Sequence, residues 1–145
     1  MELKDRVIVI TGGSGGIGKA MTQAFLSEGA SKIVLVDLNE EALNQAANEL
    51  GADAKVCDVT KEEEVQSLVD TVLKQYNRID LFCSNAGALS PSGVLTDAGN
   101  ESWQAQWDLN VMAHLYAARA VLPSMLARKE GYLLNTASAA GLLAN

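Results

Sequence analysis

Residues 11–20 read TGGSGGIGKA and directly follow the apolar run VIVI at residues 7–10. A strand that turns through several glycines into a helix points backbone N–H groups at one spot, and proteins use this arrangement to bind phosphate groups. The stretch therefore predicts a strand, a tight turn and a helix that meet at a phosphate-binding site.

Two classes of nucleotide site share these glycines. Gly13, Gly18 and Lys19 nearly complete the P-loop pattern G-x-x-x-x-G-K-[ST], and Gly13, Gly15 and Gly18 complete the dinucleotide pattern G-x-G-x-x-G. The P-loop requires Ser or Thr after its lysine because that hydroxyl binds Mg²⁺, whereas this chain has Ala20. The dinucleotide site is favoured over the P-loop. A glycine-rich turn without a ligand remains an alternative, because G-x-G-x-x-G alone is a weak signal.

The rest of the chain alternates short apolar runs with amphipathic segments. Strands are expected at residues 7–11, 32–36, 54–59, 79–84 and 132–137. Helices are expected at residues 16–28, 40–50, 61–76 and 101–129. Asn39 is expected to cap the second helix, Thr60 and Glu63 to form a capping box on the third, and Pro123 to bend the fourth. This pattern predicts a doubly wound, Rossmann-like, three-layer α/β/α domain with a parallel sheet.

Several polar or glycine-rich segments stand directly after the expected strands. They are Thr11–Gly16, Asp37, Asp58, Asn85 and Ser138. The carboxyl ends of parallel strands meet at one edge of a sheet, where doubly wound proteins bind their ligands. We therefore expect these residues to surround one site.

Asp37 ends the second expected strand, nineteen residues after Gly18. An acidic residue at about this spacing accepts hydrogen bonds from the adenosine ribose of NAD and repels the 2′-phosphate of NADP. Leu38 and Asn39 follow it, and neither is basic. NAD is therefore the expected cofactor, in preference to NADP. A simple helix N-terminal charge does not account for the strand-end position of Asp37.

With these features, the chain resembles the N-terminal part of the classical short-chain dehydrogenase/reductase family. The family signature T-G-x-x-x-G-x-G is matched by Thr11, Gly12, Gly16 and Gly18. Four further family segments occur in order, namely CDVT with Asp58 and Val59, SNAG at residues 84–87, WDLN ending at Asn110, and NTASAAG at residues 135–141 with Ser138.

The resemblance implies a set of site residues. The cofactor-binding residues would be Thr11, Gly12, Ser14, Gly15, Gly16, Ile17, Gly18, Asp37, Leu38, Asp58, Val59, Asn85, Ala86 and Gly87. Ser138 would bind the substrate oxygen and Asn110 would hold a water near the catalytic lysine, with no metal involved. The resemblance further implies hydride transfer between NAD(H) and an alcohol or ketone, a substrate-bordering stretch at residues 88–103, and a homo-oligomer (a dimer or a tetramer) formed through the long helix.

The proton-transfer pair of that family, Tyr-x-x-x-Lys, is missing from these 145 residues. The residues four positions after Tyr76, Tyr116 and Tyr132 are Asp80, Ala120 and Thr136. We therefore expect residues 1–145 to be the NAD(P)-binding domain of a longer enzyme, cut after its fifth strand and lacking the C-terminal catalytic and substrate-binding part. This chain alone is expected to be inactive. A non-catalytic dinucleotide-binding or interaction module derived from the family is the alternative.

Four side chains on the long helix have structural alternatives to a functional role. A structural hydrogen bond explains Asn110 about as well as catalysis does, because a buried amide needs partners. His114 lies four residues further on and is expected to be a core or rim histidine rather than a proton shuttle. Trp103 and Trp107 are expected to pack rather than to contact substrate.

Composition limits the partners and the compartment. The net charge of −7 argues against nucleic acid or an anionic membrane as a partner. Cys57 and Cys83 have no metal-like spacing and are expected to be buried free thiols in a reducing compartment. No apolar stretch approaches a membrane span, and the charged start MELKDR is unlike a secretory signal. We therefore expect a cytoplasmic protein.

Overall fold

A parallel β-sheet forms the centre of the structure, a computed structural model that describes residues 1–89 and 97–139. The strands lie in the order β3-β2-β1-β4-β5, and each neighbouring pair is parallel. The strands are β1 (Val7–Thr11), β2 (Lys32–Asp37), β3 (Asp53–Val56), β4 (Leu81–Ser84) and β5 (Tyr132–Asn135). The helices are α1 (Gly16–Ser27), α2 (Glu40–Leu50), α3 (Glu62–Tyr76), α4 (Asn100–Trp107), the π-helix η2 (Asp108–Met112) and α5 (Ala113–Arg128). The predicted doubly wound α/β fold is confirmed.

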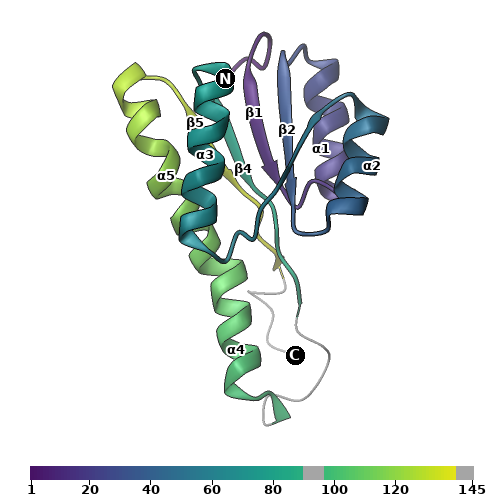
Figure 1. The fold of residues 1–145 in the computed structure, drawn as a ribbon, viewed down its shortest axis with the longest axis vertical. Helices are drawn as coiled ribbons and strands as arrows, with labels where there is room; N and C mark the ends of the chain where they lie inside the picture. The colour runs from purple at the N-terminus through teal and green to yellow at the C-terminus, as the bar shows by residue number, and fades with distance from the viewer. Residues whose placement is uncertain (90–96, 140–145) are drawn as a thin grey trace.

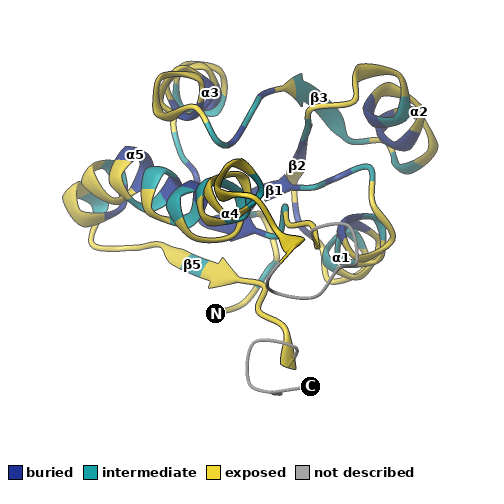
Figure 2. Ribbon diagram, turned by 90° about the horizontal axis from the view of Figure 1, so that it is seen from below, coloured by how far each residue is buried: buried dark blue, intermediate teal, exposed yellow. Residues whose placement is uncertain are grey.

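Helices cover both faces of the sheet, α1 and α2 on one side and α3 and α5 on the other (Figures 1 and 2). Successive side chains of a strand point to opposite faces. Val7 and Val9 of β1 accordingly belong to the core beneath α3 and α5, and Ile8 and Ile10 belong to the core beneath α1 and α2. All four side chains are buried, so β1 is apolar at consecutive positions, as a strand covered on both faces must be.

The direction of winding reverses between β1 and β4. From β1 the chain proceeds through α1, β2 and α2 to the edge strand β3, and α3 then returns it to the other side of β1, where β4 and β5 follow. The carboxyl ends of the strands lie toward the lower side of Figure 1, where α4 extends beyond the sheet. Doubly wound sheets bind ligands at such a reversal point.

The two predicted helix caps have different outcomes. Asn39 caps α2 as predicted, because its side chain accepts a first-turn backbone N–H at 3.1 Å. The predicted capping box of Thr60 and Glu63 is wrong, since α3 begins two residues after Thr60 with no side-chain cap. The hydroxyl of Thr60 instead donates to Asp58 Oδ1 at 2.7 Å, and its backbone N–H donates to the same atom at 3.0 Å. The Thr60 hydroxyl, which was expected to cap the helix, is therefore hydrogen-bonded to the Asp58 carboxylate instead.

The predicted continuous helix over residues 101–129 is divided into three pieces. Five residues, Asp108–Met112, form a π-helical turn between α4 and α5. Pro123 lies inside α5, which continues for another turn to Arg128. The interruption therefore occurs at the π-helical turn, upstream of the proline. Short π-helical turns occur disproportionately at functional sites.

An apolar stripe runs along the outer face of α4, η2 and α5. It consists of Trp103, Trp107, Val111 and Leu115, which are spaced by four residues. The two tryptophans are 53% and 55% exposed, so their predicted packing is wrong for the chain by itself. Burial of these rings would require a surface from outside the described residues.

Cys57 and Cys83 are buried free thiols, as predicted. Burial raises the pKa of Cys83 to about 12. Burial, with the neighbouring carboxylates of Glu64 and Asp58, raises the pKa of Cys57 to about 11. Within residues 1–89 and 97–139, none of the helices combines the length and apolar character that crossing a membrane requires.

Candidate functional site

Close packing accounts for three glycines of the turn between β1 and α1. Gly12 has a φ of +66°, and a Cβ atom there would lie 3.0 Å from the Cα of Ala86. A Cβ on Gly13 would lie 2.8 Å from the Cβ of Leu35, and one on Gly18 would overlap the carbonyl oxygen of Gly12. These glycines allow the turn to press against β2 and against the segment that follows β4.

Gly16 has a different environment. Apart from its chain neighbours and the backbone of its own helix, a Cβ atom on Gly16 would meet no atom of the described residues within 4 Å, and its φ is not positive. Gly15 is the N-cap of α1, and the first helical hydrogen bond runs from Lys19 N to Gly15 O at 2.9 Å. The N–H groups of Gly16, Ile17 and Gly18 precede this bond and therefore lack helical partners. Neither strain nor packing requires glycine at position 16, whereas close approach of a ligand to the helix N-terminus would require it.

The carboxylate of Asp37 lies against this turn. Its Oδ2 atom accepts hydrogen bonds from the backbone N–H of Ser14 at 3.1 Å and from the Ser14 hydroxyl at 2.6 Å. Its Oδ1 atom accepts from the backbone N–H groups of Leu38 at 2.8 Å and Asn39 at 3.3 Å. Asp37 does not cap α2, because Asn39 does so. A half-buried acid thus stands beside the glycine-rich turn at the end of β2.

A second carboxylate, Asp58, lies where the chain leaves β3. Its Oδ1 atom holds Thr60, and its backbone N–H donates to Glu64 at 2.8 Å. The next residue, Val59, is buried at 8% exposure. The backbone N–H of Val59 has no acceptor within residues 1–89 and 97–139. An unpaired donor beside a carboxylate suits a ligand that offers one acceptor and one donor on the same edge, as adenine does.

Thr11 joins the glycine-rich turn to the segment after β4. Its hydroxyl accepts the N–H groups of Asn85 at 2.9 Å and Ala86 at 3.0 Å, and it donates to the carbonyl of Cys83 at 3.4 Å. The side chain of Asn85 donates to the Thr11 carbonyl at 3.0 Å and accepts from Thr136 at 3.0 Å. Thr11 and Asn85 therefore tie together β1, β4 and the end of β5.

These segments surround one cleft of about 420 Å³. Every residue predicted to bind cofactor lines the cleft except Thr11, whose side chain is buried. The lining also includes four residues that were not predicted, Val36, Cys57, Thr60 and Leu109. Thr60 could have been found from its position two residues after Asp58, whereas nothing in the sequence indicates that Leu109 of η2 reaches the cleft.

The predicted catalytic residue Asn110 does not line this cleft. Its side chain donates to the carbonyl of Ala88 at 3.0 Å and accepts the Ala88 N–H at 3.2 Å. It also donates to Gln106 at 3.0 Å. Both ends of the amide thus attach the segment after β4 to the π-helical turn, in agreement with the structural alternative for this residue.

The predicted catalytic residue Ser138 also lies apart from the cleft. It is exposed and follows β5 by three residues. Part of its sequence segment, residues 140–141, and part of the expected substrate-bordering stretch, residues 90–96, lie outside the described residues. His114 is half-buried beside a void of about 10 Å³ that Thr11 also lines.

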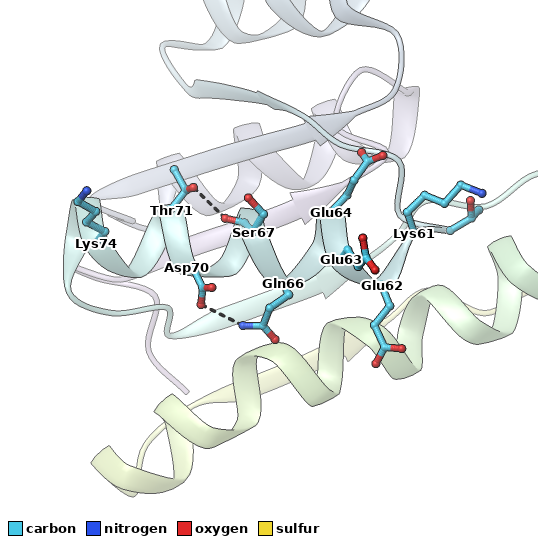
Figure 3. A pocket seen from close by; sticks show the side chains of 10 residues that line it. Lys61, Glu62, Glu63, Glu64, Gln66, Ser67, Asp70, Thr71 and Lys74 are labelled. Carbon is cyan, nitrogen blue, oxygen red and sulfur yellow. Dashed lines mark hydrogen bonds between the residues drawn. The ribbon is translucent and has the colours of Figure 1, made fainter.

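A larger hollow of about 1080 Å³ lies along α3 (Figure 3). It is lined only by α3 and the two residues before it, and its carboxylates, Glu62, Glu63, Glu64 and Asp70, outnumber its two lysines. Such a surface repels phosphate and encloses a ligand poorly, so its volume alone does not make it the site. Within residues 1–89 and 97–139, no cluster of His, Cys, Asp or Glu side chains is suited to hold a metal ion.

The parallel sheet, the glycine-rich turn into α1 and the acid at the end of β2 place the chain in the Rossmann-like class of α/β proteins. The family described as short chain dehydrogenase matches residues 6–145. An uncharacterized oxidoreductase of Staphylococcus saprophyticus is 35% identical over 97% of this chain and 62% of its own length. The chain belongs to the short-chain dehydrogenase family.

Two solved structures are similar over the full chain. A short-chain dehydrogenase/reductase from Burkholderia phymatum in complex with NAD is 34% identical, with a TM-score of 0.93 over 100% of this chain and 53% of that one. An NAD⁺-bound xylitol dehydrogenase is 32% identical, with a TM-score of 0.90 over 100% of this chain and 57% of that one. The chain thus spans little more than half the length of these structures.

Proposed function

We propose that residues 1–145 form the NAD-binding domain of an oxidoreductase that transfers a hydride between NAD(H) and an alcohol or ketone. The cleft beside Gly16 and Asp37 is the observation that carries this proposal. The free N–H groups at the start of α1 suit the pyrophosphate, Asp37 suits the adenosine ribose, and Asp58 with the Val59 N–H suits adenine. The bound nicotinamide would supply the hydride, while the protein supplies position and charge. The NAD complexes of the two structural relatives support the choice of cofactor.

The chemical step depends on residues beyond the cleft. We assign Ser138 to the substrate oxygen and Asn110 to the support of the site, and the chain holds no Tyr-x-x-x-Lys pair to move the proton. Loss of general acid–base help costs on the order of 10²–10⁴-fold in rate, so the chain alone is proposed to be inactive. A non-catalytic dinucleotide-binding module remains the second candidate. Sequencing the gene past codon 145 distinguishes the two candidates. Codons for Tyr-x-x-x-Lys shortly after codon 145 would support the enzyme, and a stop codon would support the non-catalytic module.

NADPH is expected to bind the purified chain about ten-fold or more weakly than NADH does, because the Asp37 carboxylate repels a 2′-phosphate. Titration of nicotinamide fluorescence measures both dissociation constants. Asp37→Ala should bring the two constants close together, whereas Asp70→Ala, which removes an exposed carboxylate on α3, should leave them unchanged. Tight binding of Mg²⁺-ATP without binding of NADH would contradict the proposal and support a P-loop site.

We also propose that the whole enzyme is a cytoplasmic homo-oligomer that uses the apolar stripe of Trp103, Trp107, Val111 and Leu115. The exposed stripe supports the assembly, and the buried free thiols support the compartment. Trp107→Glu is expected to convert the oligomer to monomer in sedimentation velocity. Val56→Glu replaces an exposed apolar residue at the far edge of the sheet and should leave the mass unchanged. A monomeric wild-type protein would contradict the proposed assembly.

A further inference from the structure

The hydroxyl of Ser14 is the closest hydrogen-bond partner of the Asp37 carboxylate. The two side chains are 23 residues apart in sequence and come from different elements, the glycine-rich turn and the end of β2. The hydroxyl donates to Oδ2 at 2.6 Å, and the Ser14 N–H donates to the same atom at 3.1 Å. The opposite oxygen, Oδ1, accepts from the two backbone N–H groups that follow Asp37. Among residues 1–89 and 97–139, Ser14 is therefore the one side chain that donates a hydrogen bond to this carboxylate.

The turn that carries Ser14 is itself fixed to β2. The N–H of Gly13 donates to the carbonyl of Val36 at 3.0 Å, and the space beside Gly13 is filled by Leu35. Ser14 is half-buried and has no positive φ, so its backbone fits other residue types. A donor on a fixed turn restricts the rotamer of the acid it binds, because hydrogen bonds to a charged group are stronger than those between neutral groups.

We propose that Ser14 is a positioning residue that sets the preference of the cleft for NAD over NADP by holding the Asp37 carboxylate against the glycine-rich turn. This inference rests on the proposed function. Held in place, the carboxylate can accept hydrogen bonds from ribose hydroxyls and repel a 2′-phosphate at the same position. Without the hydroxyl, the half-buried carboxylate can turn toward water, which weakens NADH binding and relieves the repulsion of NADPH together.

The test is the ratio of the dissociation constants of NADPH and NADH in the purified 145-residue chain. Ser14→Ala is expected to lower this ratio about ten-fold, the effect of losing one hydrogen bond to a charged group. Ser14→Thr keeps the hydroxyl and is expected to restore the ratio. In an Asp37→Ala background, Ser14→Ala should leave the ratio unchanged, because Ser14 acts through the carboxylate.

A purely structural role for Ser14 would lower the unfolding midpoint of Ser14→Ala while leaving the ratio constant, and this result would overturn the inference. If Ser14→Ala changes the ratio of dissociation constants equally with and without Asp37, the inference is also overturned. Tighter NADH binding by Ser14→Ala would overturn it too, because it would show that the hydroxyl competes with the ribose for the carboxylate. If the wild type binds NADH and Ser14→Ala keeps the wild-type ratio, this inference fails and the proposed function stands. If the wild type binds no NADH, both fail.

Discussion

Asp80→Ala is expected to lower the free energy of unfolding by about 3–5 kcal/mol, the usual cost of removing one partner from a buried ion cluster. The side chain of Asp80 is 1% exposed at the amino-terminal edge of the sheet. It accepts the N–H of Val7 at 2.9 Å, Arg78 Nε at 2.8 Å and an Arg128 nitrogen at 3.3 Å. Arg6 lies 3.8 Å from the same carboxylate. One carboxylate thus joins the starts of β1 and β4 to the end of α5, and its removal leaves a buried N–H and three arginines without their shared acceptor.

The same cluster predicts a loss of stability in acid. Burial alone would raise the pKa of Asp80, but hydrogen bonds from Arg78 and the Val7 N–H outweigh burial and hold the pKa below the usual 3.8. A carboxyl with a lowered folded pKa stabilises the fold above its unfolded pKa and loses that contribution as the pH falls through the folded value. The stabilisation is therefore complete at neutral pH and declines below about pH 4.

Urea unfolding at pH 7 and pH 3 measures both effects. Asp80→Asn keeps the shape of the side chain without its charge and should show a smaller difference between the two pH values than the wild type does. The control, Asp70→Ala, removes an exposed carboxylate that accepts a hydrogen bond from Gln66 on its own helix, and should change stability by less than about 0.5 kcal/mol. Equal stability of Asp80→Ala and the wild type would show that the arginines find other partners at no cost.

The sheet and the position of the cleft could be predicted because both depend on short-range patterns. Apolar strands alternating with helices require a covered parallel sheet, and this topology places Thr11, Asp37, Asp58 and Asn85 at neighbouring strand ends. Which of these side chains line the cleft and which are buried could not be predicted in the same way. Thr11 is buried and does not line the cleft, because its hydroxyl accepts hydrogen bonds from the backbone N–H groups of Asn85 and Ala86, which follow β4.

The features that escaped prediction depend on competition or on missing partners. Thr60 fits a capping box by spacing, but the nearby carboxylate of Asp58 is a stronger acceptor for its hydroxyl. The tryptophans at positions 103 and 107 have core-like spacing, yet no element of the described chain covers their face. The role of Asp80 depends on residues from two distant parts of the chain, near Val7 and near Arg128, and no sequence motif brings these together.

Gly16→Ala is expected to weaken NADH binding by about 100-fold or more while leaving the free energy of unfolding nearly unchanged. Outside its own helix and its chain neighbours, the added methyl group meets no atom of the described residues within 4 Å, and alanine is at least as good a helix former as glycine, so the fold is not harmed. The methyl group would occupy the approach to the free N–H groups of α1. Losing two hydrogen bonds to a charged phosphate, at roughly 1.5 kcal/mol each, corresponds to that factor.

Gly18→Ala is the matched control for the same turn. Its methyl group would overlap the backbone carbonyl of Gly12, so this variant should lose both stability and NADH binding. Thermal unfolding and nicotinamide fluorescence, measured on both variants, separate a ligand-contacting glycine from a packing glycine. If Gly16→Ala binds NADH as the wild type does, no phosphate approaches the N-terminus of α1 and the proposed cofactor site is wrong. If both variants lose stability equally, the turn is held together by contacts at Gly16, in conflict with the open space observed there.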